Sequence, residues 1–166
     1  MTFDIRDILT PDLDAVLTLN QSEVPALGSI DIEQMRWFAS HAAYFRVAMS
    51  GEDLAAFLIG LRPASEYASP NYRWFCDHYD DFAYIDRVAV ATIARRQGLA
   101  SRLYDDFLES LPGDVSVLAC EVNINPPNES SMRFHARYGF DQVGSQEIDN
   151  GTKEVALMVK DLRSIR

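Results

Sequence analysis

The chain has 166 residues, of which 48% are hydrophobic and 24% are charged. This length suits one domain over residues 1–166, and the apolar content is enough for a core, which excludes a mainly disordered chain. The longest apolar run, near Leu54–Leu61, falls short of the ~20 residues of a membrane-spanning helix. The first residues lack a basic and then apolar signal pattern, so we expect a cytoplasmic protein.

The chain carries 15 basic and 25 acidic residues, a formal net charge of −10. Electrostatic repulsion therefore disfavours nucleic acid and anionic membranes as partners. The acidity either attracts a cationic substrate or serves solubility. The two cysteines, Cys76 and Cys120, are too few for a disulfide scaffold and too scattered for a zinc ribbon.

Helix signals come first in the chain: Thr10-Pro11-Asp12 begins one helix, and Asp31 with Gln34 forms a capping box for a second. Hydrophobic patterning then predicts further helices at 98–111 and 128–138, and strands at 44–49, 54–61, 83–90, 115–122, 140–148 and 152–159. Asn150-Gly151 predicts the turn of the last hairpin. With a short first strand, the order is β-αα-β-β-β-α-β-α-β-β. This order predicts a mixed α/β (α+β) domain with one central sheet flanked by helices.

The most informative segment joins the strand at 83–90 to the following helix through Arg95-Arg-Gln-Gly98-Leu-Ala100. The free N–H groups of a helix's first turn, together with its dipole, favour an anion. Gly98 lets a phosphate approach the backbone. The segment lacks both Gly-Lys-Ser/Thr and Gly-x-Gly-x-x-Gly, so it matches neither nucleoside triphosphatases nor dinucleotide-binding proteins. The alternative is an ordinary helix start with solvated arginines.

A second motif lies downstream, Asn128-x-x-Ser131-x-x-x-His135-x-x-Tyr138-Gly139-Phe140. Together, the two motifs, their spacing and the element order resemble the GNAT superfamily of acyl-CoA-dependent N-acyltransferases over nearly the whole chain. The resemblance implies a central mixed sheet that is splayed between the strands at 84–90 and 115–122. It also implies acetyl-CoA as the co-substrate and no metal.

The resemblance also implies roles for individual residues. Asn128 and Ser131 are expected to contact the pantetheine arm, and the Val88 N–H to stabilise the oxyanion. The remaining backbone contacts are expected along the strand and its loop, from Val88, Ala89, Val90, Arg95, Arg96, Gln97, Gly98, Leu99, Ala100 and Ser101.

One position departs from the family pattern, because His135 stands where the family often has the tyrosine that protonates the leaving thiolate. A histidine with its ordinary pKa of ~6.5 is partly protonated at neutral pH and can donate a proton. Tyr138 is the alternative acid, although its position usually holds an apolar packing residue.

Two acids lie in otherwise apolar strands, Asp86 and Glu121. Because burying an acid is costly, each is a candidate for the base that deprotonates an amine, directly or through water. Asp86 shares a strand face with Val88, and Glu121 shares one with Asn123. The alternative for Asp86 is an ion pair with a neighbouring arginine and no chemistry.

Residues 66–84 hold seven of the chain's 18 aromatic residues and several acids. This segment is longer than the usual family connection, so it forms either a flap over the acceptor or a small helix that packs its aromatics on the sheet. Cys76, Asp77, His78 and Asp80 match no established metal-ligand spacing. Cys120 is predicted to be a small core residue.

The sequence therefore predicts an acetyl-CoA-dependent N-acetyltransferase that acts by direct transfer in a ternary complex. The acceptor is a primary amine of a small molecule, an amino acid or a peptide. Two alternatives stay open, a non-catalytic acyl-CoA-binding or regulatory module on the same fold and a plain structural domain. We expect no nucleic acid or membrane partner, and the sequence leaves a homodimer open.

Overall fold

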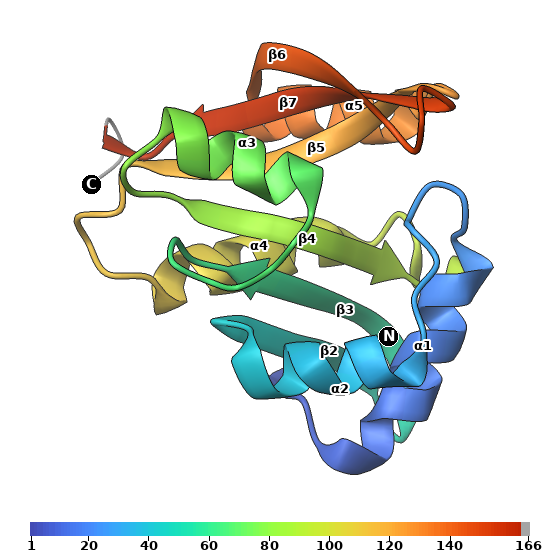
Figure 1. Cartoon of the computed structure of the whole chain (residues 1–166). Coiled ribbons are helices and arrows are strands. Elements are labelled where there is room, and N and C mark those ends of the chain that lie inside the picture. The colour runs from blue at the N-terminus through green and yellow to red at the C-terminus, as the bar shows by residue number, and fades with distance from the viewer. Residues whose placement is uncertain (164–166) are drawn as a thin grey trace. The chain divides into compact units, whose positions relative to one another are not determined.

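The computed structural model describes residues 1–163, in which seven strands and five α-helices follow one another (Figure 1). The strands are β1 (Asp4–Asp7), β2 (Tyr44–Ser50), β3 (Asp53–Leu61), β4 (Ala83–Val90), β5 (Val117–Asn125), β6 (Asp141–Ile148) and β7 (Lys153–Asp161). The helices are α1 (Leu13–Ser22), α2 (Ile32–His41), α3 (Pro70–His78), α4 (Leu99–Ser110) and α5 (Glu129–Tyr138). Helix α3 is an addition to the predicted order, and the predicted strand 115–122 lies two to three residues further on.

The chain divides into two compact units, Met1–Leu61 with Arg87–Ser110, and Arg62–Asp86 with the chain from Leu111 onward. Strand β4 contributes its second half to the first unit and its first half to the second.

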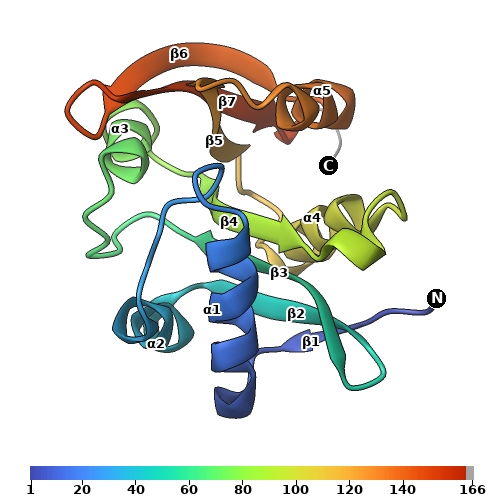
Figure 2. The same ribbon diagram turned by 90° about the vertical axis from the view of Figure 1, so that its right-hand side faces the viewer.

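In the first unit, β1, β2 and β3 form an antiparallel sheet, and the Ala91 N–H at the end of β4 donates to the carbonyl oxygen of Ala55 on β3 at 2.8 Å. Helices α1 and α2 cover one face of these strands, and α4 covers the other (Figures 1 and 2). The N-cap predicted at the start of α2 is confirmed, because Oδ1 of Asp31 accepts from the Gln34 N–H at 2.8 Å.

The buried face of α4 includes Leu99, Leu103 and Phe107, and Phe107 packs directly over Gly60 of β3. A Cβ atom at Gly60 would lie only 2.4 Å from Cζ of Phe107, so the close approach requires glycine. Asp106 adds a polar anchor, since its Oδ2 accepts from the Tyr44 hydroxyl at 2.7 Å and from Nη1 of Arg46 at 2.8 Å. These contacts fix α4, and therefore its first turn, against the sheet of the first unit.

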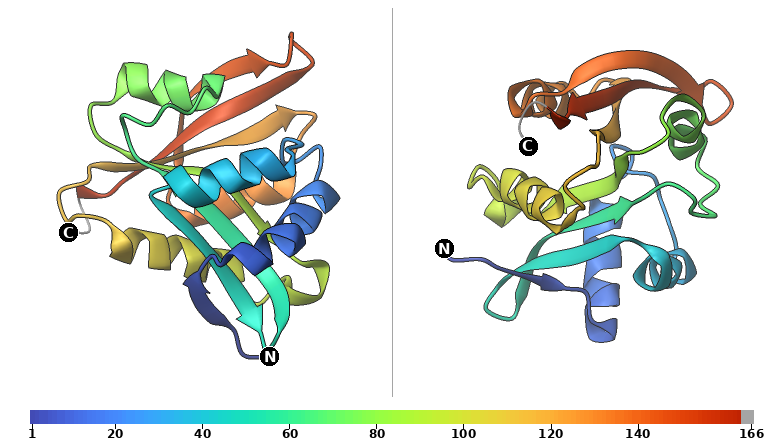
Figure 3. Two further views of the ribbon diagram at one scale, coloured as in Figure 1. Left: turned by 60° about the horizontal axis from the view of Figure 1, so that its bottom comes forward. Right: turned by 90° about the vertical axis from the view of Figure 1, so that its left-hand side faces the viewer.

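In the second unit, β4 pairs in parallel with β5, and β5, β7 and β6 follow as antiparallel neighbours. The parallel ladder joins two residue pairs, Ala83 with Leu118 and Tyr84 with Ala119. Helix α3 lies on one face of these strands and α5 on the other (Figures 2 and 3). The strand order is β1-β2-β3-β4-β5-β7-β6, which confirms the predicted mixed α/β fold with a central sheet.

None of the helices within residues 1–163 is both long and apolar enough to cross a membrane.

Candidate functional site

The loop that follows β4 presents the open end of α4. A short 3₁₀ turn, Thr92–Ala94, leads to Arg95, and the chain then turns through Arg96 and Gly98, whose φ angles are +62° and +71°. The Gly98 carbonyl accepts the first helical bond, from the Arg102 N–H at 3.1 Å. Among the described residues, the N–H groups of Leu99, Ala100 and Ser101 have no hydrogen-bond partner. Three adjacent donors at a helix N-terminus form a site for an anion.

Gly98 has no packing role in the protein, because a Cβ atom added to it would meet nothing within 4 Å. Its positive φ and the open space beside it leave the backbone donors accessible to a large anion. The loop side chains from Arg95 to Gln97 are exposed. The geometry therefore suits a ligand that is held mainly by backbone N–H groups.

The Arg95 side chain is directed toward α1. Its Nη2 lies 2.5 Å from Oε1 of Glu23, and its Nε donates to the carbonyl oxygen of Val90 at 3.2 Å. The guanidinium therefore ties the loop to the end of α1. The neighbouring Arg96 is exposed and has no partner among the described residues.

Just before the loop, Val88, Ala89 and Val90 end β4. Ala89 is buried, whereas Val88 and Val90 are half-buried on the opposite strand face. These three residues lie beyond the two-pair ladder that joins β4 to β5.

In the second unit, Asn128 caps α5. Its Oδ1 accepts from the Ser131 N–H at 3.2 Å, and its own N–H donates to the carbonyl oxygen of Asn123 at 3.0 Å. Since the cap occupies Oδ1, the amide is held in one orientation. Its Nδ2 group has no partner among residues 1–163 and is available to donate.

His135 lies one helical turn after Ser131 and is 4% exposed. Its Nδ1 is 2.7 Å from the Ser131 carbonyl oxygen and 3.2 Å from Ser131 Oγ. The expectation of an ordinary pKa for His135 is wrong. Burial lowers the pKa of His135, and the hydrogen bond to Ser131 offsets only part of this effect. At neutral pH the imidazole is therefore mainly neutral.

Tyr138 lies in an aromatic cluster at the end of α5. Its ring is 5.9 Å from that of Phe134 and 6.0 Å from that of Phe140, and the Lys160 ammonium lies 5.1 Å from the Tyr138 ring centre. Lys160 Nζ also donates to the Tyr138 carbonyl oxygen at 2.8 Å. The ring thus makes the packing contacts that are typical of an apolar residue at this position.

The two candidate bases are both half-buried, Asp86 on β4 and Glu121 on β5. Glu121 has a partner that the sequence analysis missed, because Oε2 of Glu121 accepts from the hydroxyl of Tyr84 at 2.6 Å. The pKa of Tyr84 is raised well above its ordinary value, first by burial and then by the charges of Glu121 and Asp86. Strand alternation places Tyr84 on the same face as Asp86, but it does not relate either residue to Glu121 on the neighbouring strand.

The segment between β3 and β4 contains the small helix that was one of the two sequence alternatives. Ser69 caps α3, and Tyr72 and Phe75 are fully buried against Phe82 and Tyr84. In the cluster of Cys76, Asp77, His78 and Asp80, the histidine contacts Trp74. Nδ1 of His78 bonds to the Trp74 carbonyl oxygen at 2.7 Å, and the centres of the two rings stack 3.7 Å apart. Within residues 1–163, no group of three or more His, Cys, Asp or Glu side chains could hold a metal ion.

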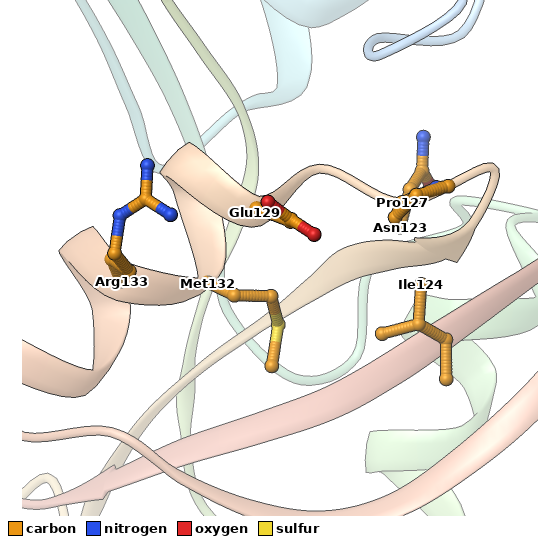
Figure 4. A pocket seen from close by; sticks show the side chains of 6 residues that line it. All are labelled: Asn123, Ile124, Pro127, Glu129, Met132 and Arg133. Carbon is orange, nitrogen blue, oxygen red and sulfur yellow. The ribbon is translucent and has the colours of Figure 1, made fainter.

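A pocket of about 370 Å³ opens where β5 ends and α5 begins (Figure 4). Ile124 and Met132 point to the same side of α5 and form its apolar part, while Glu129 and Arg133 lie one turn apart on the helix. The pocket belongs wholly to the second unit. Its lining depends on the irregular end of β5, which the strand pattern did not predict.

Solved structures share this fold. The protein NAA60 from Arabidopsis thaliana, crystallised in complex with a bisubstrate analogue, superposes with a TM-score of 0.76 at 18% identity, covering 96% of this chain and 98% of that one. The ribosomal-protein-S18-alanine N-acetyltransferase from Escherichia coli superposes with a TM-score of 0.72 at 17% identity, covering 97% and 94%. These similarities establish the fold.

The sequence model of the acetyltransferase (GNAT) family matches residues 5–140, so the chain belongs to the GNAT family. A phosphinothricin N-acetyltransferase from Streptomyces coelicolor is 28% identical over 116 residues, which are 68% of this chain. The match spans 63% of that protein's length. The resemblance expected from Arg95-x-x-Gly98-x-Ala100 and the Asn128 helix is thereby confirmed.

Proposed function

We propose that this chain is an N-acetyltransferase that moves the acetyl group of acetyl-CoA directly to a primary amine of a small molecule, an amino acid or a peptide. The observation that carries the proposal is that the N–H groups of Leu99, Ala100 and Ser101, beside Gly98, have no hydrogen-bond partner within residues 1–163. These donors fit a pyrophosphate. The name of the Streptomyces coelicolor relative, which acetylates phosphinothricin on nitrogen, also supports the proposal.

In this proposal, acetyl-CoA supplies an activated acetyl thioester when bound. The first turn of α4 donates to the pyrophosphate, and the backbone of Val88–Val90 pairs with the pantetheine arm. Asn128 adds its free Nδ2 donor. The loop from Arg95 to Ser101 and the side chain of Ser131, which the sequence predicts to contact the cofactor, belong to the same proposed site.

The chemistry that we propose uses an acid, an oxyanion donor and a base. Glu121 or Asp86 takes a proton from the acceptor ammonium, so that the neutral nitrogen can form a bond to the acetyl carbon. The Val88 N–H donates to the acyl oxygen while it carries negative charge. As the carbon–sulfur bond breaks, His135 or Tyr138 supplies the proton that the thiolate takes up. The nitrogen gives its second proton to solvent as the amide forms. No acetyl-enzyme forms, and the reaction needs both substrates at once.

We further propose that the acceptor is cationic. The chain has a net charge of −10, and residues 66–82 combine aromatic side chains with exposed acids such as Asp77 and Asp80. Aromatic faces and carboxylates both attract ammonium groups.

A second candidate function is an acyl-CoA-binding module without turnover. The observation that favours it is His135, which replaces the usual tyrosine and is mainly neutral at neutral pH because its pKa is lowered.

Calorimetry with acetyl-CoA tests the proposal on the wild type, Gly98→Asp and Gly98→Asn. Asp and Asn both tolerate a positive φ, and the open space at Gly98 accepts either side chain. The aspartate should abolish binding through repulsion of the pyrophosphate, whereas the neutral asparagine should retain part of it. Wild-type affinity in a folded Gly98→Asp protein would overturn the assignment.

A panel of primary amines then separates the two candidate functions. Release of free thiol with at least one amine supports the enzyme. Binding of acetyl-CoA without thiol release across amino acids, polyamines and peptides supports the non-catalytic module.

A further inference from the structure

We propose that Tyr84 is a positioning residue for Glu121, holding its carboxylate in the orientation and charge state in which it takes a proton from the acceptor amine. The inference rests on the proposed function and assigns the base to Glu121 rather than to Asp86. Tyr84 acts through Glu121 and has no direct part in the transfer.

The geometry of the pair follows from the sheet. Tyr84 is paired in register with Ala119, and Glu121 lies two residues further along β5 on the same face. The Tyr84 hydroxyl therefore reaches the carboxylate across neighbouring strands, and its O–H donates to Oε2 at 2.6 Å. This is a short hydrogen bond, as expected when the acceptor is charged.

Helix α3 holds the Tyr84 ring in place. The Tyr72 ring lies 5.5 Å away in an edge arrangement, and the Phe75 ring lies 5.8 Å away. Tyr72 is itself fixed, since its hydroxyl donates to the Arg62 carbonyl oxygen at 2.7 Å and accepts from the Ser65 N–H at 3.1 Å. The Tyr84 side chain is completely buried, so the ring cannot turn away and exchange Glu121 for water.

The Tyr84 hydroxyl remains a donor at every pH at which a carboxyl group titrates, because burial and nearby acids raise its pKa. The titratable groups around the pair are Asp86 on β4, Tyr67 before α3, Tyr72 on α3 and Cys120 beside Glu121. The hydrogen bond from Tyr84 favours the ionised carboxylate of Glu121 over the neutral acid.

A phenylalanine would fill the same space without the hydroxyl, so Tyr84→Phe isolates the proposed role. We expect kcat to fall by about 10- to 100-fold, the range for one hydrogen bond to a charged group. The KM for acetyl-CoA should stay unchanged. The acid limb of the pH profile of kcat/KM should move to higher pH, because the Glu121 carboxylate is then protonated more readily.

Tyr72→Phe is the matched control. It also removes one buried hydroxyl from the same aromatic cluster, but this hydroxyl bonds to backbone atoms and not to a carboxylate. We expect its acid limb to coincide with that of the wild type, even if its melting temperature falls as far as that of Tyr84→Phe. An unmoved acid limb in Tyr84→Phe, or equal shifts in both variants, would overturn the inference.

A second measurement does not require activity. The side-chain carboxyl of Glu121 is followed by ¹³C NMR in glutamate-labelled protein, with the signal assigned through Glu121→Gln. The titration midpoint should be higher in Tyr84→Phe than in the wild type, and equal midpoints would overturn the inference. If the midpoint differs between the two proteins but the wild type acetylates no amine, the proposed function is rejected. The coupling between Tyr84 and Glu121 is then still established.

Discussion

Nδ1 of His135 lies 2.7 Å from the carbonyl oxygen of Ser131, one turn earlier on α5. A carbonyl oxygen accepts only, so the bond places a proton on Nδ1 and favours that tautomer of the neutral ring. The T-shaped contact with Phe140, at 5.1 Å, closes the imidazole off from water. The residue that replaces the family's usual tyrosine is therefore a buried, oriented and mainly neutral histidine.

The lowered pKa of His135 has a consequence for stability. Between this pKa and the ordinary value of ~6.5, the unfolded chain binds the proton more readily, so stability should fall as pH falls through this window. One proton contributes up to ~1.4 kcal/mol per pH unit. Urea denaturation at pH 8 and pH 5 should show a larger loss for the wild type than for His135→Gln, which cannot titrate. A constant difference between the two proteins would contradict the burial effect.

The identity of the general acid can be tested by kcat. We expect His135→Ala to lower kcat by about 10²-fold or more, the usual contribution of a general acid, and Tyr138→Phe to leave it nearly unchanged. The wild-type rate should fall with rising pH from a value below 6.5, because the pKa of His135 is lowered. His135→Tyr, which restores the usual family residue, should remove this fall. Loss of rate only in Tyr138→Phe would assign the role to the tyrosine.

Arg95 raises a separate question, because its guanidinium is paired with Glu23 at 2.5 Å. If Arg95 leaves Glu23 for the pyrophosphate, Arg95→Ala should weaken acetyl-CoA binding by ~1.5–3 kcal/mol. Glu23→Gln should then leave the affinity unchanged or increase it, since the competing carboxylate is gone. Calorimetry on both variants decides the matter. Equal weakening in the two would show that the arginine acts by tethering the loop to α1.

The contact of Gly60 with Phe107 predicts a packing defect. Gly60→Ala would bring Cβ to 2.4 Å from the ring, so we expect a loss of about 1–3 kcal/mol in the free energy of unfolding. Gly28→Ala is the matched control, because a Cβ atom there meets nothing within 4 Å. Chemical denaturation of both variants measures the effect. A Gly60→Ala protein as stable as the control would show that α4 can move away from β3.

The amino-acid sequence by itself determined the features that depend on neighbours along the chain. The Asp31 cap, the bounds of β4 and the end of α5 at Tyr138 all appear where the patterns predict them. Each depends on contacts within about one turn or one strand. For the same reason, the sequence could point to Gly98 and to the open first turn of α4.

Only the tertiary structure decided how the candidate side chains are partnered. Tyr84 and Glu121 are 37 residues apart, and Arg95 and Glu23 are 72 residues apart, so no local pattern could pair them. The pKa of His135 was equally inaccessible, because burial sets it and burial depends on what packs against α5. The residue types in the sequence identify which groups can do chemistry. Distances and desolvation arise only when the chain is folded, and they decide the protonation state and orientation in which each group is held.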